Sequence, residues 1–350
     1  MTEQSSSELD LTRYVRQMRY PELGEDGQRA LLRSCALVCG CGALGSAIAA
    51  TLARAGVGTL RIVDRDFVEL SNLQRQTLFD EDDVASGLPK AVAAANKLRR
   101  VNSQITIEPI VANVSAANIV ELIEDVDVIV DGTDNFETRF LLNDAALKYG
   151  IPWVFGGCVG SQGQTMTILP RVTPCLRCVL SEPPPAGAMP TCDTAGILAP
   201  IVAVIAAIQS QEAIKILSGH RDAVQRSMIV VDLWTNQLRH VGLDALLRNT
   251  SCLACAGSET PWLDGIRGSD TTVLCGRNAV QISDRSGGSI ALEELESRLR
   301  GVGRVMRNAF LLRIEVDGYV LTVFPDRRAI ISGTDDPVLA RSVYARYVGT

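Results

Sequence analysis

A glycine-rich turn between a short apolar segment and a helical segment constrains the fold of this 350-residue chain more than any other feature. The apolar segment Cys35–Cys39 has the composition of a buried strand, and Leu44–Ala55 has that of a helix ending at Gly56. Glycines in such a turn let main-chain N–H groups approach an anion at the start of the helix. The pattern predicts an α/β fold with a Rossmann-like, mostly parallel sheet and helices on both faces. The turn itself contains Gly40, Gly42, Ala43 and Gly45.

Charged side chains gather where the predicted strands end. The strand Thr59–Val63 runs into Asp64, and the strand Val126–Val130 runs into the segment that holds Asp134. Because ligands of open parallel sheets bind beyond the carboxyl ends of the strands, we expect these side chains to share one crevice. The group also contains Arg75, in the loop that follows Asp64, and Lys90, at the start of a predicted helix over Ala91–Arg100.

Two cations and two carboxylates around such a turn favour a nucleoside triphosphate with Mg²⁺ over a nicotinamide. Arg75 and Lys90 would neutralise charge on the phosphates, and Asp134 would hold the metal directly or through water. An NAD-dependent oxidoreductase on the same fold is the alternative. It lacks an evident hydride-transfer acid, because the only histidines, His220 and His240, lie far downstream.

The cysteines include two Cys-x-x-Cys steps, which together have the spacing of a structural zinc site with four thiolate ligands. A redox-active Cys-x-x-Cys is the alternative, but the duplication of the step favours a metal. The predicted ligands are Cys175, Cys178, Cys252 and Cys255.

Composition limits the classes of partner. The net charge of −6 argues against a dedicated nucleic-acid-binding protein, which would usually be basic. The longest apolar run, Ala195–Ile208, is too short to cross a bilayer and contains Pro200, so we expect a buried or subunit-facing helix. Residues 1–12 are polar and predict a disordered lead without a secretion signal. We therefore expect a cytoplasmic protein with neither a nucleic-acid nor a membrane partner.

The composition changes again near the C-terminus. Residues 258–270 lie in a stretch rich in Gly, Ser and Pro and are predicted to link a main domain, 13–257, to a small α+β module, 271–350. We expect the module to dock a partner or support a dimer. Its Cys275 is either a sulfur relay or, more simply, a half-buried strand-end thiol. The predicted elements are strands at Thr271–Leu274, Phe310–Val316 and Tyr319–Phe324 and helices at Ala291–Arg300 and Val338–Tyr347.

From Arg13 to about Ala256 the chain resembles the ThiF/MoeB/HesA family, the bacterial branch of the ubiquitin-activating enzymes. The resemblance rests on these motifs in combination with the two cysteine pairs. They are Arg13-Tyr-Val-Arg16-Gln17, the glycine turn, Asp64-x-Asp66, Ser71-Asn72-Leu73-Gln74-Arg75-Gln76, Gly87-x-Pro89-Lys90 and Asp131-x-Thr133-Asp134-Asn135.

The resemblance implies a reaction and a set of residues for it. Such enzymes use ATP and Mg²⁺ to adenylate the C-terminal glycine of a small ubiquitin-fold sulfur carrier that ends in Gly-Gly, and they release pyrophosphate. Thiamine, molybdopterin and related thiolation pathways use this chemistry. By position, Asp64 would bind the ribose, Asn72, Arg75 and Lys90 the phosphates, and Asp134 the Mg²⁺. The full implied nucleotide set is Gly40, Gly42, Ala43, Gly45, Asp64, Asp66, Ser71, Asn72, Gln74, Arg75, Lys90, Asp134 and Asn135, with Ala43 replacing a glycine found in many relatives.

The resemblance also implies a homodimer and a thiol step. Arg16 would reach the triphosphate bound by the neighbouring subunit. Cys192, on a loop near a helix start, would attack the acyl-adenylate or form an acyl-disulfide, and a cysteine desulfurase is the possible sulfur source. An unreactive Cys192 is the alternative for that residue. A non-catalytic scaffold subunit is the alternative for the whole chain, although such subunits usually lose the cationic residues kept here.

Overall fold

The computed structural model describes residues 10–184, 192–247, 252–268, 271–274, 278–282 and 289–349, without the side chains of 192, 193, 247 and 271–274. The chain divides into two compact units. The first contains Met1–Pro183 and Leu198–Ile266, and the second contains Pro184–Ile197 and Arg267–Thr350.

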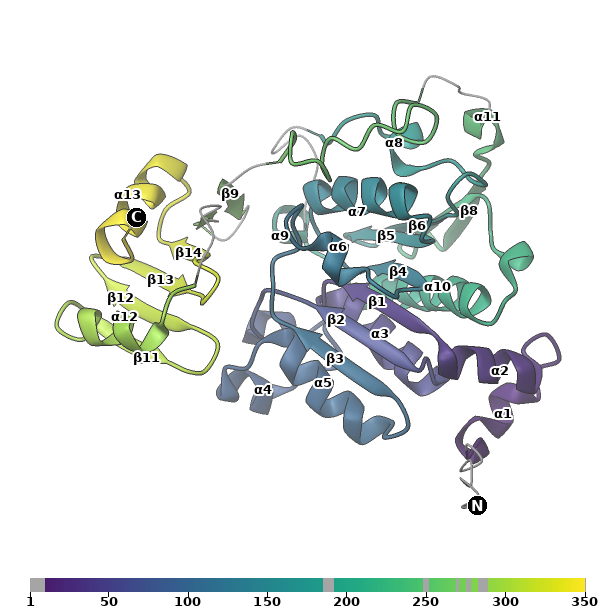
Figure 1. Cartoon of the computed structure of the whole chain (residues 1–350), viewed down its shortest axis with the longest axis horizontal. Coiled ribbons are helices and arrows are strands. Elements are labelled where there is room, and N and C mark those ends of the chain that lie inside the picture. The colour runs from purple at the N-terminus through teal and green to yellow at the C-terminus, as the bar shows by residue number, and fades with distance from the viewer. Residues whose placement is uncertain are drawn as a thin grey trace, which may run out of the picture. The chain divides into compact units, whose positions relative to one another are not determined.

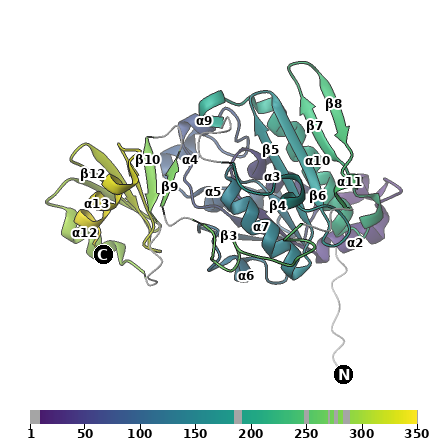
Figure 2. The same cartoon turned by 90° about the horizontal axis from the view of Figure 1, so that it is seen from above.

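The first unit is built on an eight-stranded sheet (Figure 1). Its strands are β1 (Cys35–Cys39), β2 (Thr59–Val63), β3 (Thr106–Ile110), β4 (Val128–Asp131), β5 (Trp153–Val159), β6 (Gln162–Ile168), β7 (Met228–Asp232) and β8 (Gln237–Val241). They lie in the order β3-β2-β1-β4-β5-β6-β7-β8. The strands from β3 to β5 pair in parallel, and β6, β7 and β8 add antiparallel neighbours. The β7–β8 hairpin forms one edge (Figure 2). The predicted mostly parallel sheet is confirmed.

Helices cover both faces of this sheet, because successive residues of its central strand are buried on opposite sides. In β1, Leu37 and Cys39 pack into the core beside Phe140, whereas Ala36 and Val38 are equally buried on the other face. The helices are α1 (Val15–Met18), α2 (Gly24–Arg33), α3 (Ala43–Ala55), α4 (Glu81–Ser86), α5 (Lys90–Val101), α6 (Ile119–Leu122), α7 (Phe136–Tyr149), α8 (Leu176–Val179), α10 (Ala199–Leu217) and α11 (Asp244–Leu247). Short 3₁₀ helices lie at Thr12–Tyr14, Leu70–Asn72 and Arg221–Ala223.

The longest helix, α10, differs from the segment predicted for it. It spans 19 residues, Ala199–Leu217, rather than Ala195–Ile208, and by length and composition alone it could cross a membrane. It nevertheless packs against α3, β5 and β6 and carries buried polar groups. Gln209 is fully buried and donates from Nε2 to the main-chain oxygen of Asp131 at 2.8 Å. These contacts make α10 a core helix of the first unit.

Three glycines bring the first turn of the sheet and the end of β4 into main-chain contact. A Cβ atom on Gly45 would lie 1.8 Å from the Gly40 oxygen, and one on Gly132 would lie 2.4 Å from that same oxygen. Gly40 itself has a φ of +85°, which disfavours a side chain. Gly42 differs, because a Cβ there would have only the Gln76 Nε2 within 4 Å, at 3.9 Å. The protein's own packing therefore requires Gly40, Gly45 and Gly132 but not Gly42.

The second unit contains a six-stranded sheet in the order β11-β12-β13-β14-β10-β9, in which every pairing is antiparallel. Its strands are β9 (Thr271–Leu274), β10 (Ala279–Ile282), β11 (Arg304–Arg307), β12 (Leu312–Val316), β13 (Tyr319–Val323) and β14 (Ala329–Ser332), and its helices are α9 (Cys192–Ala195), α12 (Leu292–Leu299) and α13 (Pro337–Tyr347). The strand, helix, hairpin and final helix predicted for this region are present, and β10, β11 and β14 were not predicted. The α+β class is confirmed.

The segment predicted as a linker is folded over part of its length. Trp262 and Leu263 are buried in the core of the first unit, where the Trp262 ring lies 4.6 Å from the ring of Phe140 on α7. Asp264 pairs with Lys148 at 3.4 Å. The Gly/Ser/Pro composition predicted a linker, but Trp262 packs into the core. The first unit therefore extends to Ile266.

The glycine contacts predict effects of very different size for two substitutions in the same turn. Gly45→Ala places a methyl group inside the van der Waals radius of the Gly40 oxygen and should lower the free energy of unfolding of the first unit by about 3 kcal/mol or more. Gly42→Ala meets no close atom and should change it by no more than about 1 kcal/mol. Thermal and urea unfolding followed by circular dichroism would measure both. Equal stability of the two variants would contradict this account of the turn.

Candidate functional site

Asp64, directly after β2, holds the glycine turn in place. Its Oδ2 accepts from the main-chain N–H of Cys41 at 2.6 Å, and its Oδ1 accepts from that of Asp66, also at 2.6 Å. Burial raises the pKa of the Asp64 carboxyl, and the nearby Lys90 charge opposes that rise. The residue predicted to bind a ribose therefore also links the ends of β1 and β2.

Lys90 lies at the first position of α5, as predicted, and its side chain is only 4% exposed. Its Nζ lies 3.4 Å from Oδ2 of Asp66, and its main-chain N–H donates to the Asp66 oxygen at 2.8 Å. Asp66 thus holds the ammonium group of Lys90 beside Asp64. The buried cation is positioned at the carboxyl edge of the sheet, where a phosphate ligand would meet it.

The third strand end, that of β4, is organised by a buried ion pair that the sequence analysis did not select. Arg139 Nε lies 3.2 Å from Oδ2 of Asp131, and Arg139 Nη2 donates to the main-chain oxygens of Thr133 at 2.7 Å and Gly156 at 2.9 Å. Burial raises the pKa of Asp131, and the charge of Arg139 counteracts this. The pair fixes the path of the segment that carries Asp134.

Asp134 and Asn135 have different environments. Asp134 is exposed, and no hydrogen bond or ion pair engages its carboxylate among the described residues. Asn135 caps α7, because its Oδ1 accepts from the Thr138 N–H at 2.8 Å. Asp134 is thus available as a metal ligand, whereas the side-chain oxygen of Asn135 already has a structural partner.

The polar residues of the loop after β2 differ in their exposure to solvent. Asn72 is buried and its Oδ1 accepts from the Glu69 N–H at 3.2 Å, so this side chain shapes the loop. Ser71 and Gln74 are exposed. Arg75 is half-buried and donates from Nη1 to the Ser71 oxygen at 2.9 Å, which leaves part of its guanidinium accessible.

Arg16 lies away from the turn of its own chain. The adjacent Gln17 donates from Nε2 to the oxygen of Ala55, the last residue of α3, at 2.9 Å. The turn adjoins the first residue of that helix, and the 13 residues of α3 span roughly 20 Å. The exposed Arg16 therefore lies near the opposite end of α3 from Gly42.

The four cysteines of the paired steps come together. Their Sγ atoms all lie within 4.8 Å of one another. The separations are 3.7 Å for Cys175–Cys178, 3.7 Å for Cys175–Cys252 and 3.4 Å for Cys178–Cys255. A tetrahedral zinc ion with Zn–S bonds of about 2.3 Å requires sulfur separations of about 3.8 Å. The cluster fits a four-thiolate zinc site.

Buried polar contacts join this cluster to α7. Asn143 Oδ1 accepts from the Leu176 N–H at 2.9 Å, inside the first cysteine step. Asp144 Oδ2 accepts from the Trp262 N–H at 3.0 Å, and Arg177 stacks over the Trp262 ring with its Cζ 5.2 Å from the centroid. Burial raises the pKa of Asp144 to about 6. The cysteine cluster and the segment after it are therefore bound to the helix that follows Asp134.

Two predicted thiols are not placed. Cys192 begins α9, but its side chain lies outside the described residues, and so does all of Cys275. Their suggested chemical roles stay predictions.

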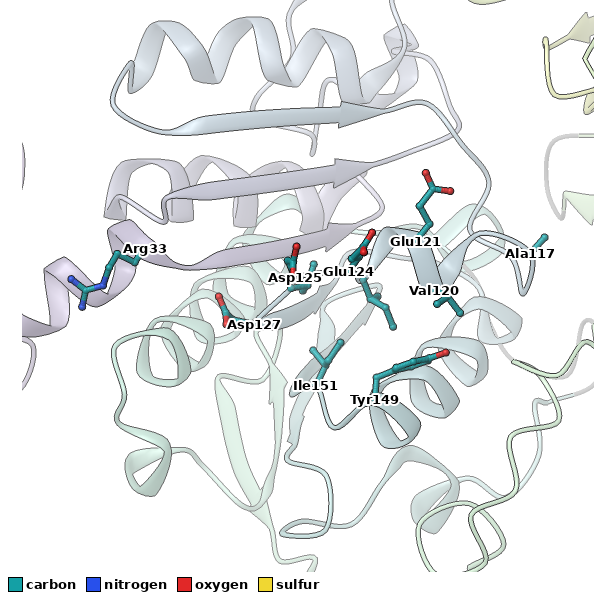
Figure 3. A pocket seen from close by; sticks show the side chains of 11 residues that line it. Arg33, Ala117, Val120, Glu121, Glu124, Asp125, Asp127, Tyr149 and Ile151 are labelled. Atoms are coloured by element: carbon teal, nitrogen blue, oxygen red, sulfur yellow. The ribbon is translucent and has the colours of Figure 1, made fainter.

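A separate hollow of about 890 Å³ lies beside the residues that precede β4 (Figure 3). Because Asp127 immediately precedes that strand, the hollow is at its amino end, whereas Asp134 follows its carboxyl end. None of the predicted site residues lines it. Its charged and aromatic lining residues are Arg33, Glu121, Glu124, Asp125, Asp127 and Tyr149. The hollow is therefore distinct from the glycine-turn site.

Comparison with known proteins identifies the family. Residues 14–254 match the ThiF family. The chain is 45% identical over 339 residues to the sulfur carrier protein ThiS adenylyltransferase of Bacillus subtilis, an alignment covering 96% of this chain and 99% of that protein. It is 36% identical over 256 residues to the sulfur carrier protein adenylyltransferase of Thermus thermophilus, covering 72% of this chain and 93% of that protein.

Solved structures show the same fold. The crystal structure of Escherichia coli MccB with ATP superposes with a TM-score of 0.61 at 22% identity, covering 71% of this chain and 75% of that one. The crystal structure of PaaA gives a TM-score of 0.58 at 24% identity, with coverages of 69% and 76%. With its glycine turn, charged strand ends and cysteine cluster in the places the sequence predicts, the chain is a member of the ThiF family.

Proposed function

We propose that this chain is an ATP-dependent adenylyltransferase that activates the C-terminal glycine carboxylate of a small ubiquitin-fold sulfur carrier protein and releases pyrophosphate. The observation that carries the proposal is the convergence of the uncapped start of α3 with Asp64 and the buried Lys90 at one sheet edge. The names of the relatives that share most of the chain agree with it.

The positive groups of the site reduce the electrostatic repulsion that opposes this reaction. A carboxylate is repelled by the α-phosphate it must attack, and pyrophosphate must leave with its charge compensated. Lys90 is held at the sheet edge by Asp66 before any ligand arrives, so little reorganisation is needed to place it. Arg75 and the N–H groups at the start of α3 add further positive potential. No general base is required, because a terminal carboxylate is already ionised at neutral pH.

A magnesium ion fits the charge pattern of the site. Asp134 is an exposed carboxylate at the carboxyl end of β4, and Mg²⁺ is commonly held by one or two carboxylates together with substrate phosphates. When bound there, the ion would compensate phosphate charge. Asp134 would hold it, while Arg139 and Asp131 keep the segment bearing Asp134 in position.

The two alternatives have less support. An NAD-dependent oxidoreductase has no counterpart among the relatives described above, which are named as adenylyltransferases. A non-catalytic scaffold subunit would have no need for a buried lysine paired at the phosphate edge.

The position of Arg16 supports a homodimer with composite sites. Because this arginine lies near the far end of α3 from its own turn, we assign it to the site of another subunit. In such a dimer Arg16 would approach the triphosphate bound by the partner.

The carrier, the sulfur source and the second unit complete the proposal. The Bacillus relative, aligned over 99% of its length, is named for ThiS, so a ThiS-type carrier in thiamine synthesis is the first substrate to test, and a MoaD-type carrier the second. A cysteine desulfurase would supply sulfur, and Cys192 would take part after adenylation, in the cytoplasm. The Thermus relative, named as an adenylyltransferase, aligns over 93% of its own length with only 72% of this chain, so part of this chain is not shared with it. Residues 271–350 would serve carrier docking or dimer support.

Carrier-dependent exchange of labelled pyrophosphate into ATP tests the activity. Asp134→Ala should abolish the exchange, because it removes the metal ligand, and Arg75→Ala should lower it by roughly two to three orders of magnitude. The matched controls are Asp222→Ala and Arg221→Ala, two exposed residues of one 3₁₀ helix, which should retain the exchange of the unmodified enzyme. A protein that binds ATP but shows no exchange with any Gly-Gly carrier would disprove the proposed reaction.

The same assay separates adenylation from the thiol step. Cys192→Ala should leave the exchange nearly intact, even if it blocks sulfur delivery, since adenylation comes first. Loss of exchange in a folded Cys192→Ala protein would mean that this residue acts earlier than proposed.

Subunit mixing tests the composite site. Arg16→Ala and Asp134→Ala subunits should each be inactive alone, and a mixed dimer should regain activity through the one site that combines an intact Arg16 with an intact Asp134. Differently tagged subunits, purified together and assayed for exchange, would measure this. Verified mixed dimers without activity would rule out the shared site.

Elemental analysis should find one zinc per chain. Cys252→Ser should lower the free energy of unfolding by several kcal/mol and release the metal, because the binding energy of the zinc is coupled to folding. Cys35→Ser, at a partly buried thiol outside the cluster, should keep the zinc and most of the stability. A metal-free protein with full stability would refute the zinc assignment.

A further inference from the structure

Gln76 is a buried polar residue beside the glycine turn for which the fold gives no explanation. It follows Arg75 in the loop after β2, and its main-chain N–H donates to the Asn72 oxygen at 3.0 Å. The residue is only 3% exposed. Its Oε1 is fully buried, and neither this oxygen nor the amide Nε2 has a hydrogen-bond partner among the described residues.

A buried amide without hydrogen-bond partners lowers the stability of the ligand-free protein. A buried amide oxygen without a partner destabilises the folded state, and an apolar side chain of the same shape would remove that cost. An acceptor group on a ligand would give the unpaired Nε2 donors the partner that the fold does not supply. Glutamine serves here neither as a helix cap nor as a link between strands, in contrast to Asn72 and Asn135, whose side-chain oxygens accept main-chain N–H groups.

The amide lies against the one glycine of the turn that the packing does not require. A Cβ on Gly42 would find the Gln76 Nε2 as its sole neighbour within 4 Å, at 3.9 Å. Gly42 is also the residue that precedes α3, and no side chain caps the first N–H groups of that helix. The Gln76 amide and the start of α3 therefore border the same space.

The hydrogen-bond donors and the positive charge around that space favour an anionic ligand. Main-chain N–H groups at a helix start attract anions, and Lys90 supplies a positive charge to the same edge. Phosphate oxygens are acceptors only, so they need donors, and a primary amide supplies two. We propose that Gln76 is a further nucleotide-binding residue, which donates a hydrogen bond from its amide to a phosphate oxygen of ATP at the glycine turn. This inference rests on the proposed function and names an additional contact within that site.

Three variants test this contact through ATP binding alone, without the carrier. Gln76→Glu keeps the size of the side chain, removes the donor and adds a negative charge, so it should weaken ATP binding roughly tenfold to a hundredfold. Gln76→Met removes only the polarity and should weaken ATP binding roughly tenfold. Adenosine lacks phosphates, so both variants should bind it within about twofold of the unmodified protein. Titration calorimetry on the full chain with Mg²⁺ would measure these affinities.

Two controls separate a ligand contact from a structural role. Thr77→Glu places the same charge at an exposed neighbouring position and should change ATP affinity by less than about twofold. Without nucleotide, Gln76→Met should melt at the same temperature as the unmodified protein or higher, because the unpaired oxygen is gone.

Other outcomes would overturn the inference. They are unchanged ATP affinity in both Gln76 variants, equal weakening of ATP and adenosine, or a rise in the KM for the carrier alone. Because the readout is nucleotide affinity, it stands even if the unmodified protein proves unable to adenylate any carrier. If Gln76→Glu does not fold, the ratio of ATP to adenosine affinity in Gln76→Met decides the question.

Discussion

The main-chain contact between the glycine turn and the end of β4 is the constraint on which the site depends. With any side chain at Gly45 or Gly132, the Gly40 oxygen would have to move, and the ends of β1 and β4 would separate. Asp64 closes the other side of the turn through the Cys41 N–H. Three strand ends are thus joined by atoms of the main chain and one carboxylate, and the start of α3 is left facing outward with no side-chain cap. The anion site is a consequence of this packing.

The buried charges at this edge are better explained by function than by stability. Burial raises the pKa of both Asp64 and Asp131, and the charges of Lys90 and Arg139 oppose that rise. Buried ion pairs rarely stabilise a fold more than apolar residues of the same size. Lys90 with Asp66 and Arg139 with Asp131 nevertheless place fixed charges and dipoles around the position expected for the phosphates. Preorganised charge of this kind lowers the barrier to a reaction that creates a charged leaving group.

The sequence predicted what depends on local pattern and missed what depends on tertiary contact. The glycine turn, the strand that precedes Asp64, the helix start at Lys90 and the four-cysteine cluster follow from spacing along the chain, and the structure contains all of them. Arg139 lies outside the sequence motifs, and Gln76 ends the motif that begins at Ser71 without a role assigned to it there, so only burial and hydrogen bonding distinguish these two residues.

The other differences between prediction and structure also arise from tertiary contacts. The strand β11 consists of Arg304–Arg307, mostly exposed and with no apolar alternation, so its extended form comes from pairing with β12. Trp262 lies in a segment with linker composition. Its aromatic ring nevertheless packs against Phe140, despite the surrounding glycines and serines. A large apolar side chain outweighs local flexibility when a matching core position exists.

The helix α7 joins the two parts of the first unit that the sequence treats as separate motifs. Its first turn is capped by Asn135, next to the predicted metal ligand Asp134, and its middle carries Asn143 and Asp144, which bind the cysteine step and the Trp262 segment. A rigid helix transmits any displacement at one end to the other, because its hydrogen bonds leave little freedom within a turn. Four thiolates held by one metal would therefore fix more than the loop that contains them. They would set the position of α7, and with it the position of the carboxylate at the edge of the nucleotide site.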